Sequence, residues 1–440
     1  MTDERYREIC TYLKDLLSGT RWEGHVYAVG GCCRDSLLGL PVNDIDLAVS
    51  LPDGGVELAR WLERKRLLVE RPTLFPKFGT SRIRLRAFPE DEIEAVQTRR
   101  EKYTSHNSRC PETAFGSIEE DCMRRDFTAN SLYMNISTGE LLDLTGRGVA
   151  DVRSRVLRTP LDPDTTFDDD PVRLLRCIRF ASKPGWSVDP KTYEAISRNV
   201  DRLAIVSPMR ARSEIEKMLA GPSPDKAMEM MASTGAMAIL FPELRHAIAD
   251  TSAGSRWQRF LTALRRMAAD GADTLLRVAA MIWATDVNPA PLLRRLRFEK
   301  PQVADIVFLL TMLEAPARLA DKNGKMREHK LRRLQMLCGT PQRMERLLYL
   351  AGCLAEDDGK TAAMMDGIAG LDRRLREEGT DMYGFVQPLS DVEIRRIKHL
   401  RSQGAVSRCR AHLIKMACQN PIRDRKQWVK LLLAYNQGSR

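Results

Sequence analysis

Residues 26–50 read VYAVGGCCRDSLLGLPVNDIDLAVS, and this stretch decides the fold of the chain. Its first residues, Val26–Val29, form a short apolar run that predicts a buried strand. The run ends at Gly30 and Gly31, where the absence of a Cβ atom lets backbone N–H groups approach a ligand closely. A short helix and a turn follow, and residues 44–49, DIDLAV, then predict a second strand.

Two carboxylates lie at the start of this second strand. Side chains two residues apart on a strand point to the same face, so Asp44 and Asp46 lie side by side. Two like charges this close are unfavourable unless a cation lies between them, and hard oxygen ligands favour Mg²⁺. A lone DxD or GG pair is more often a solvated strand end or a turn. Together, at this spacing, they are typical of a nucleotide-using phosphoryl-transfer site.

The pattern GG-x-x-RD-x-x-LG followed by DID resembles the first signature of the class II nucleotidyltransferases. This family comprises the CCA-adding tRNA nucleotidyltransferases and the bacterial poly(A) polymerases. Its later motifs follow in the expected order: residues 120–130 (EDCMRRDFTAN) resemble its RRDFTxN element, residues 169–173 (DDPVR) its EDxxR nucleotide reader, and residues 205–214 its fifth motif. The resemblance carries specific motifs over about residues 25–220.

A third carboxylate completes the metal site of the resembling family, on a strand just before a threonine and an arginine. Residues 93–99, IEAVQTR, fit this pattern. The resemblance therefore implies that Glu94 joins Asp44 and Asp46 as a catalytic residue. Glu92 is the alternative, and a surface glutamate without a functional role also remains open.

The resemblance also implies a set of phosphate-binding groups. The amides of Gly30 and Gly31, together with Arg34, Arg124 and Arg125, are expected to position the triphosphate. Paired arginines suit this role because their guanidinium groups form charge-assisted hydrogen bonds with phosphate oxygens.

Two further residues of the RRDFTxN element are candidates for nucleotide binding. Asp126 either holds an arginine or binds a ribose hydroxyl, and Asn130 is suited to hydrogen-bond the sugar or a phosphate.

Residues 167–181 predict a helix that begins at Asp170, and they contain the nucleotide-reading motif. Asp170 and Arg173 are neighbours on one helix face. A carboxylate that accepts from an exocyclic amine, beside an arginine that donates to the ring nitrogen, selects C and A against U and G. Asp169 stands where the family usually has glutamate. The alternative is that Asp170 only caps the helix or pairs with Arg173. Further nucleotide-binding candidates on this helix are Arg176 and Arg179.

Two more segments carry family-based expectations. Residues 99–117 are polar, basic and rich in turn formers, which predicts a loop. In the resembling family a flexible loop at this place helps to change nucleotide specificity. In the fifth motif Met209 replaces the usual glutamate, while Arg210 and Glu214 are retained and are suited to brace the reading helix.

Composition excludes several classes of protein. The 440 residues are 43% hydrophobic and 29% charged, the first residues lack the apolar core of a signal peptide, and no stretch approaches a membrane span. Ten cysteines without a CxxC pair indicate reduced thiols and neither a disulfide framework nor a zinc site. We therefore expect a cytoplasmic protein.

Positive charge is concentrated at the C-terminus. The chain carries a net charge of +11, and residues 391–440 contain 12 basic and 3 acidic residues, a local net charge of +9. This predicts a surface that contacts RNA phosphates, with the acceptor arm and 3′ end of tRNA as the expected partner. A basic helical tail that serves only solubility is the alternative.

The predicted fold class is α+β, with a mixed-sheet nucleotidyltransferase head followed by an extended all-α part, since helical periodicity prevails beyond residue 220. The predicted domains are the head at residues 1–145, a base-recognising neck at 146–220, a helical body at 221–330 and a basic, tRNA-binding tail at 331–440.

The predicted function is template-independent addition of C and A, from CTP and ATP, to the 3′ end of tRNA. Two Mg²⁺ ions would activate the 3′-hydroxyl and steady the α-phosphate and the departing pyrophosphate. Three alternatives remain: a poly(A) polymerase, a specialist that adds only CC or only A, and a non-catalytic RNA-binding protein. The last is disfavoured because burying paired aspartates without a metal is costly.

Overall fold

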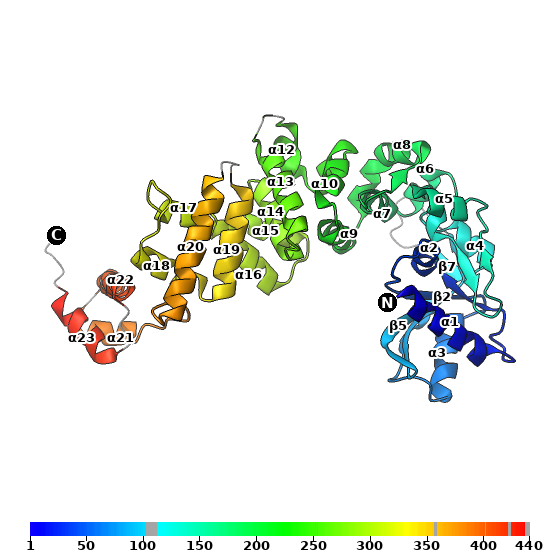
Figure 1. The fold of residues 1–440 in the computed structure, drawn as a ribbon, viewed down its shortest axis with the longest axis horizontal. Coiled ribbons are helices and arrows are strands. Elements are labelled where there is room, and N and C mark those ends of the chain that lie inside the picture. The colour runs from blue at the N-terminus through cyan, green and yellow to red at the C-terminus, as the bar shows by residue number, and fades with distance from the viewer. Residues whose placement is uncertain are drawn as a thin grey trace. The chain divides into compact units, whose positions relative to one another are not determined.

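The structure is a computed structural model that describes residues 1–102, 112–250, 252, 254–355, 359–400, 402–420 and 424–435. The chain divides into two compact units, Met1–Arg245 and His246–Arg440. Figure 1 shows a sheet with surrounding helices in the first unit and helices in the described part of the second. This architecture confirms the predicted α+β class with a mixed-sheet head and a helical remainder.

The head is built on a seven-stranded sheet with the strand order β3-β4-β5-β2-β1-β8-β9. Its strands are β1 Val26–Val29, β2 Ile45–Val49, β3 Thr73–Phe75, β4 Thr80–Leu85, β5 Phe88–Gln97, β8 Tyr133–Asn135 and β9 Leu141–Leu142. The two strands predicted from residues 26–50 are β1 and β2, and they pair antiparallel at the centre of the sheet. β2 pairs in parallel with β5 on its other side, which makes the sheet mixed.

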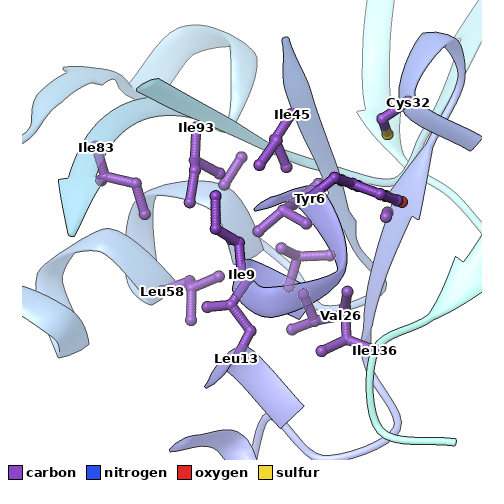
Figure 2. Packing of buried hydrophobic residues seen from close by; sticks show 14 of the residues in the cluster. Tyr6, Ile9, Leu13, Val26, Cys32, Ile45, Leu58, Ile83, Ile93 and Ile136 are labelled. Atoms are coloured by element: carbon purple, nitrogen blue, oxygen red, sulfur yellow. The ribbon is translucent and has the colours of Figure 1, made fainter. Parts of the chain in front are cut away.

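One face of this sheet is covered by the helices α1, Asp3–Leu17, and α3, Gly54–Arg64. The apolar residues of α1 recur every three or four positions, so one stripe of the helix faces the sheet. Figure 2 shows Ile9 of this helix and Leu58 of α3 beside Ile45 and Ile93 from the sheet. This packing forms the core of the head.

The opposite face of the central strands is covered by α4, Ile118–Met123. Ala48 of β2 belongs to a small buried cluster with Cys122 of α4 and Tyr133 of β8. Because side chains alternate along a strand, Asp46 lies on the same face as Ala48. The carboxylate of Asp46 therefore lies on the face that α4 covers, away from the main core.

The prediction of a loop over residues 99–117 is wrong at both ends of this range, where the chain forms strands. The strands β6, Arg99–Lys102, and β7, Glu112–Phe115, pair antiparallel. Thr98 and Gly116 close this hairpin through reciprocal hydrogen bonds, with Thr98 Oγ donating to the Gly116 carbonyl and the Gly116 N–H donating to that of Thr98. The centre of the predicted loop, residues 103–111, lies outside the described residues.

The remainder of the first unit is mainly helical. Its other helices are α2 Gly31–Leu37, α5 Gly148–Ser154, α6 Pro163–Asp169, α7 Val172–Ala181, α8 Pro190–Asn199, α9 Pro208–Ala220, α10 Pro224–Ser233 and α11 Ala236–Leu240. Two short strands, β10 Val156–Leu157 and β11 Ser187–Val188, form a parallel pair between these helices. Sequence periodicity did not predict β11, because two residues are too few to show an alternation.

The described residues of the second unit fold into helices. These are α13 Arg256–Ala269, α14 Thr274–Ala284, α15 Pro289–Arg295, α16 Lys300–Met312, α17 Ala315–Leu319, α18 Glu328–Cys338, α19 Pro341–Leu354, α20 Lys360–Glu377, α21 Asp391–Ile397, α22 Gln403–Gln419 and α23 Arg425–Ala434; α12, Arg245–Ala249, spans the boundary between the units. Trp428 of α23 is fully buried in a C-terminal cluster with Leu413 of α22 and Ile394 of α21. Among the described residues, no helix is both long and apolar enough to cross a membrane.

We expect Gly55→Ala to destabilise the first unit. A Cβ atom at Gly55 would lie 2.3 Å from the carbonyl oxygen of Ala95 and 2.4 Å from that of Gly79, so the backbone of α3 would have to move away from the sheet. Overpacking of this kind costs about 1–3 kcal/mol. Thermal unfolding followed by circular dichroism should therefore show a lower midpoint.

Gly367→Ala in α20 is the matched control, because a Cβ atom there meets no heavy atom within 4 Å. Alanine is the better helix former by about 1 kcal/mol, so this variant should unfold at the same or a higher temperature. Equal midpoints for both variants would contradict the packing described for α3.

Candidate functional site

The paired aspartates lie at the start of β2. Asp44 directly precedes the strand, and Asp46 lies within it, where the parallel register sets it opposite Glu94 of β5. Burial and the negative charge of Glu94 raise the pKa of Asp46 to about 6, although the positive charges of Arg125 and Arg176 oppose this shift. The carboxylate of Asp46 therefore stands where a bound cation would be electrostatically favoured.

Glu94 is close to Asp46 but has a partner of its own. Its carboxylate forms an ion pair with Arg82 of β4 at 3.1 Å, and its side chain is 42% exposed. The alternative candidate, Glu92 of β5, forms an ion pair with Arg84 of β4 at 3.5 Å. Sequence reasoning missed Arg82, since no motif points to a neighbour across the sheet.

The described residues gather no group of three or more His, Cys, Asp or Glu side chains that could hold a metal ion. A metal held here would take one or two carboxylate ligands from Asp44 and Asp46, and other oxygens would have to complete its shell. This donor set fits Mg²⁺, which commonly binds one or two carboxylates together with substrate phosphates and water.

The glycine turn packs against the arginines of the RRDFTxN element. Gly30 has φ = 77°, a conformation that glycine adopts without strain, and it precedes α2. A Cβ atom at Gly30 would lie 3.5 Å from Nη1 of Arg125, and one at Gly31 would lie 3.7 Å from Nη2 of Arg34. The structure thus brings the predicted glycine turn and two predicted arginines together.

A chain of buried polar contacts links α2 to α7. Arg34 forms two hydrogen bonds of 2.8 Å with Asp35 and donates a third to the side-chain oxygen of Asn130. The amide of Asn130 donates to Asp126 at 3.0 Å, and Asp126 accepts from Arg176 of α7 at 2.7 Å. Of the two roles predicted for Asp126, this structure contains the ion pair with an arginine.

Arg124 and Arg125 share one acidic partner, Asp121, which sequence reasoning missed. Asp121 accepts from Arg124 Nη2 at 2.6 Å and from Arg125 Nη2 at 3.0 Å. Arg124 also pairs with Glu101 of β6, and Arg125 donates to the hydroxyl of Tyr133. The spacing of three and four residues between Asp121 and the two arginines was an available signal. Tyr133 comes from the strand β8, and no sequence signal pointed to it.

Of the predicted base-reading pair, Asp170 lies two residues before α7 and Arg173 lies in its first turn, and each side chain has its own partners. Asp170 accepts from the N–H of Val172 and forms a 2.8 Å ion pair with Arg210 of α9. The buried guanidinium of Arg173 donates to the carbonyl oxygens of Thr166, at 3.1 Å, and Arg124, at 2.7 Å. Asp170 thus accepts from the N–H of the first residue of α7, and Arg173 would have to exchange its bonds to read a base.

The fifth motif braces α7, as its sequence predicts. Arg210 holds Asp170 at the start of α7, and Glu214 accepts from Arg179 near its end at 2.7 Å. The guanidinium of Arg179 also lies 4.2 Å from the ring centroid of Phe180. The structure therefore brings Arg176 into the polar chain around Asp126 and sets Arg179 in the contact between α7 and α9.

Two family descriptions match parts of the chain between residues 26 and 248. The Poly A polymerase head domain matches residues 26–158, and the probable RNA and SrmB-binding site of polymerase A matches residues 185–248. The mitochondrial CCA tRNA nucleotidyltransferase of Saccharomyces cerevisiae is 36% identical over 219 residues, which cover 46% of this chain and 39% of that protein. The CCA-adding enzyme of Geobacillus thermodenitrificans is 36% identical over 215 residues, which cover 48% of this chain and 49% of that enzyme. The matched part therefore spans less than half the length of either relative.

Solved structures are similar over nearly the whole chain. The apo form of a CCA-adding enzyme has a TM-score of 0.68 at 20% identity and covers 98% of this chain and 96% of its own. The Thermotoga maritima CCA-adding enzyme complexed with tRNA has a TM-score of 0.59 at 20% identity and covers 98% of this chain and 94% of its own. At this level of identity the likeness shows a shared fold.

The motif residues from Gly30 to Asn130 all lie inside the matched head domain. Family descriptions, relatives and fold agree with the motif order found in the sequence. Residues 26–158 therefore match the Poly A polymerase head domain, and their motif order resembles that of the class II nucleotidyltransferases.

Proposed function

We propose that this protein adds C and A, from CTP and ATP, to the 3′ end of tRNA without a template. The observation that carries the proposal is the parallel register of β2 and β5. It sets Asp46 opposite Glu94, on the face of the sheet that also bears the arginines of the RRDFTxN element. The relatives named CCA-adding enzymes support tRNA as the substrate.

In the proposed reaction the primer 3′-hydroxyl attacks the α-phosphate of the nucleotide. A new P–O bond forms, the bond between the α- and β-phosphates breaks, and pyrophosphate leaves. Asp44 and Asp46 would hold Mg²⁺, which when bound activates the hydroxyl and neutralises charge on the phosphates. Glu94 would act as a third ligand, and its pair with Arg82, which involves Oε2, leaves its other oxygen for a metal.

Phosphate binding is assigned to the groups that surround the glycine turn. Arg34 and Arg125 lie beside Gly30 and Gly31, so their charges and the backbone amides would share the triphosphate oxygens. Arg124 would act from the adjacent position, while Asp126 and Asn130 would orient the sugar through the polar chain that they form.

Base selection is assigned to α7. Asp170 and Arg173 would exchange their present partners for the amine and ring nitrogen of C or A. In the ion pair between Asp170 and Arg210 the arginine side chain is half exposed, which makes the pair replaceable at modest cost.

The helical remainder is proposed to hold the tRNA. In α22 and α23 the basic side chains of Arg408, Lys415, Lys426 and Lys430 are exposed. Such charges would contact backbone phosphates without reading sequence. We keep the predicted head, neck, body and tail as proposed functional segments. The boundary between the two compact units, at residue 245, falls inside the predicted body.

Addition of labelled nucleotides tests the proposal directly. Purified protein with Mg²⁺ would receive ATP, CTP, GTP or UTP and one of three primers: tRNA that ends before CCA, tRNA that ends in CC, or an unstructured RNA. Addition of two C and then one A, followed by a stop, is the expected result.

Other products would identify the alternatives. Long A tails on every primer indicate a poly(A) polymerase, which the matched head-domain description also fits. CC alone, or A only on the CC-ended primer, indicates a specialist. Tight tRNA binding without any incorporation indicates a non-catalytic RNA-binding protein.

Asp46→Asn should lower the rate of nucleotide addition by at least about 1,000-fold, because several kcal/mol of charge stabilisation depend on the metal. Binding of tRNA, measured by filter retention, should change less than about twofold, since the phosphate contacts proposed for the tail remain. Asp15→Asn, on the N-terminal helix α1, is the control and should leave both quantities unchanged. Loss of tRNA binding together with retained addition would contradict the assignment.

The raised pKa of Asp46 predicts a pH effect on the metal-free protein. The folded state binds this proton up to about pH 6, whereas an ordinary aspartate loses it near 3.8. The free energy of unfolding should therefore fall between pH 4 and pH 6, by up to about 3 kcal/mol relative to Asp46→Asn. Urea titrations in EDTA measure the difference, and parallel pH curves for the two proteins would refute it.

A further inference from the structure

We infer that Asp121 and Tyr133 are positioning residues, which hold Arg124 and Arg125 in the orientation that binds the nucleotide triphosphate. The inference rests on the proposed function and extends it to two residues that neither touch the nucleotide nor belong to the predicted site. Asp121 is the acidic centre of this arrangement, and Tyr133 connects it to Arg125.

Asp121 is a buried carboxylate with every acceptor position in use. Its side chain has no exposed surface. Oδ1 accepts from Arg124 and, at 3.1 Å, from the backbone N–H of Arg99, and Oδ2 accepts from Arg125 and from the hydroxyl of Tyr133. A carboxylate has about four lone-pair sites, so the donors from these four residues satisfy it fully. A buried charge of this kind is tolerated because it is paired and hydrogen-bonded.

The charges around Asp121 keep it ionised. Burial alone would raise the pKa of the carboxyl group, but the charges of Arg125 and Arg124 and the hydrogen bond from Tyr133 hold it well below its ordinary value. The negative charge that fixes the two arginines is therefore present throughout the physiological pH range.

Tyr133 determines which edge of the Arg125 guanidinium faces the site. Its hydroxyl donates to Asp121 and accepts from Arg125 Nε at 2.8 Å. Asp121 takes Nη2, so two of the three guanidinium nitrogens are held from one side. The third, Nη1, is the nitrogen that a Cβ atom at Gly30 would approach to 3.5 Å. The pair thus directs Nη1 toward the glycine turn.

Asp121 also holds Arg124, through Oδ1, whereas Arg125 is bound to Oδ2. Its Nε and Nη2 both donate to Oδ1 of Asp121, and its Nη1 donates to Glu101 of β6 at 2.9 Å. Asp121 therefore fixes two adjacent guanidinium groups and, through the N–H of Arg99, the base of the β6–β7 hairpin. Without it, neighbouring positive charges would repel each other and lose their common orientation.

This arrangement removes a cost of nucleotide binding. A free arginine side chain has many rotamers, and ordering it on a phosphate opposes binding. Arg124 and Arg125 are ordered in advance by Asp121, so their charges are available to the triphosphate without that loss. Loss of the hydroxyl of Tyr133 should weaken nucleotide binding and leave primer binding unchanged.

Tyr133→Phe tests the inference, because it keeps the buried ring and removes only the hydroxyl. The second unit offers a matched control in Tyr383→Phe, since the hydroxyl of Tyr383 donates to the buried Asp372 at 2.6 Å. Equilibrium dialysis would give the dissociation constants of CTP and ATP with Mg²⁺ for both variants. Primer-extension kinetics would give KM for nucleotide and for tRNA.

Tyr133→Phe is expected to raise the dissociation constant and KM of CTP and ATP by about 10-fold, the effect of one lost hydrogen bond to a charged group. Its KM for tRNA should stay within about twofold of the unchanged protein. Tyr383→Phe should lower the unfolding midpoint about as much as Tyr133→Phe does. It should leave the dissociation constants and KM values of CTP and ATP unchanged. Asp121→Asn should raise the nucleotide constants further, and if it does not fold, Tyr133→Phe alone decides.

Equal nucleotide binding by Tyr133→Phe and the unchanged protein would overturn the inference. A parallel loss of nucleotide and tRNA affinity would also overturn it, because general damage to the head would then explain the change. Failure of the unchanged protein to bind either CTP or ATP would instead remove the proposed function, and the inference with it. The two failures are therefore distinguishable.

Discussion

The parallel pairing of β2 with β5 is the constraint on which the rest of this site depends. It sets the half-buried Asp46 opposite Glu94, so negative charge accumulates at one point of the sheet and the pKa of Asp46 rises. A sheet whose other central pairs are antiparallel reaches this arrangement only because α3 and the β3–β4 segment carry the chain back before β5. Arg125 of the RRDFTxN element, packed against the glycine turn before α2, then supplies positive charge near Asp46.

Pairs of buried opposite charges hold the site together. Asp121 orders Arg124 and Arg125, while Asp126 joins Asn130 to Arg176 of α7. Each of these carboxylates is costly to bury, and each is satisfied by guanidinium or amide donors. The same bonds connect the head to the helix that carries the base-reading motif. Nucleotide binding and base recognition therefore act on one hydrogen-bonded network.

Local sequence predicted much of this site for definite physical reasons. The alternation in residues 44–49 identified β2 and the shared face of its aspartates, and the spacing of Arg210 and Glu214 identified the brace for α7. The hairpin of β6 and β7 was missed, because its polar residues show no apolar alternation. Hydrogen bonds between Thr98 and Gly116 close this strand pair.

By itself the sequence determined the elements whose cause is local: the glycine turn, the paired aspartates of β2 and the motif order that resembles a known family. Tertiary structure alone decided which charges meet. Arg82 reaches Glu94 across the sheet, and Tyr133 of β8 reaches Asp121 of the helix α4. Such partners come from distant parts of the chain, and only the strand register and helix packing bring them within hydrogen-bonding distance. The physical reason is that hydrogen bonds and ion pairs depend on separation in space, which spacing along the chain specifies only within one helix or one strand.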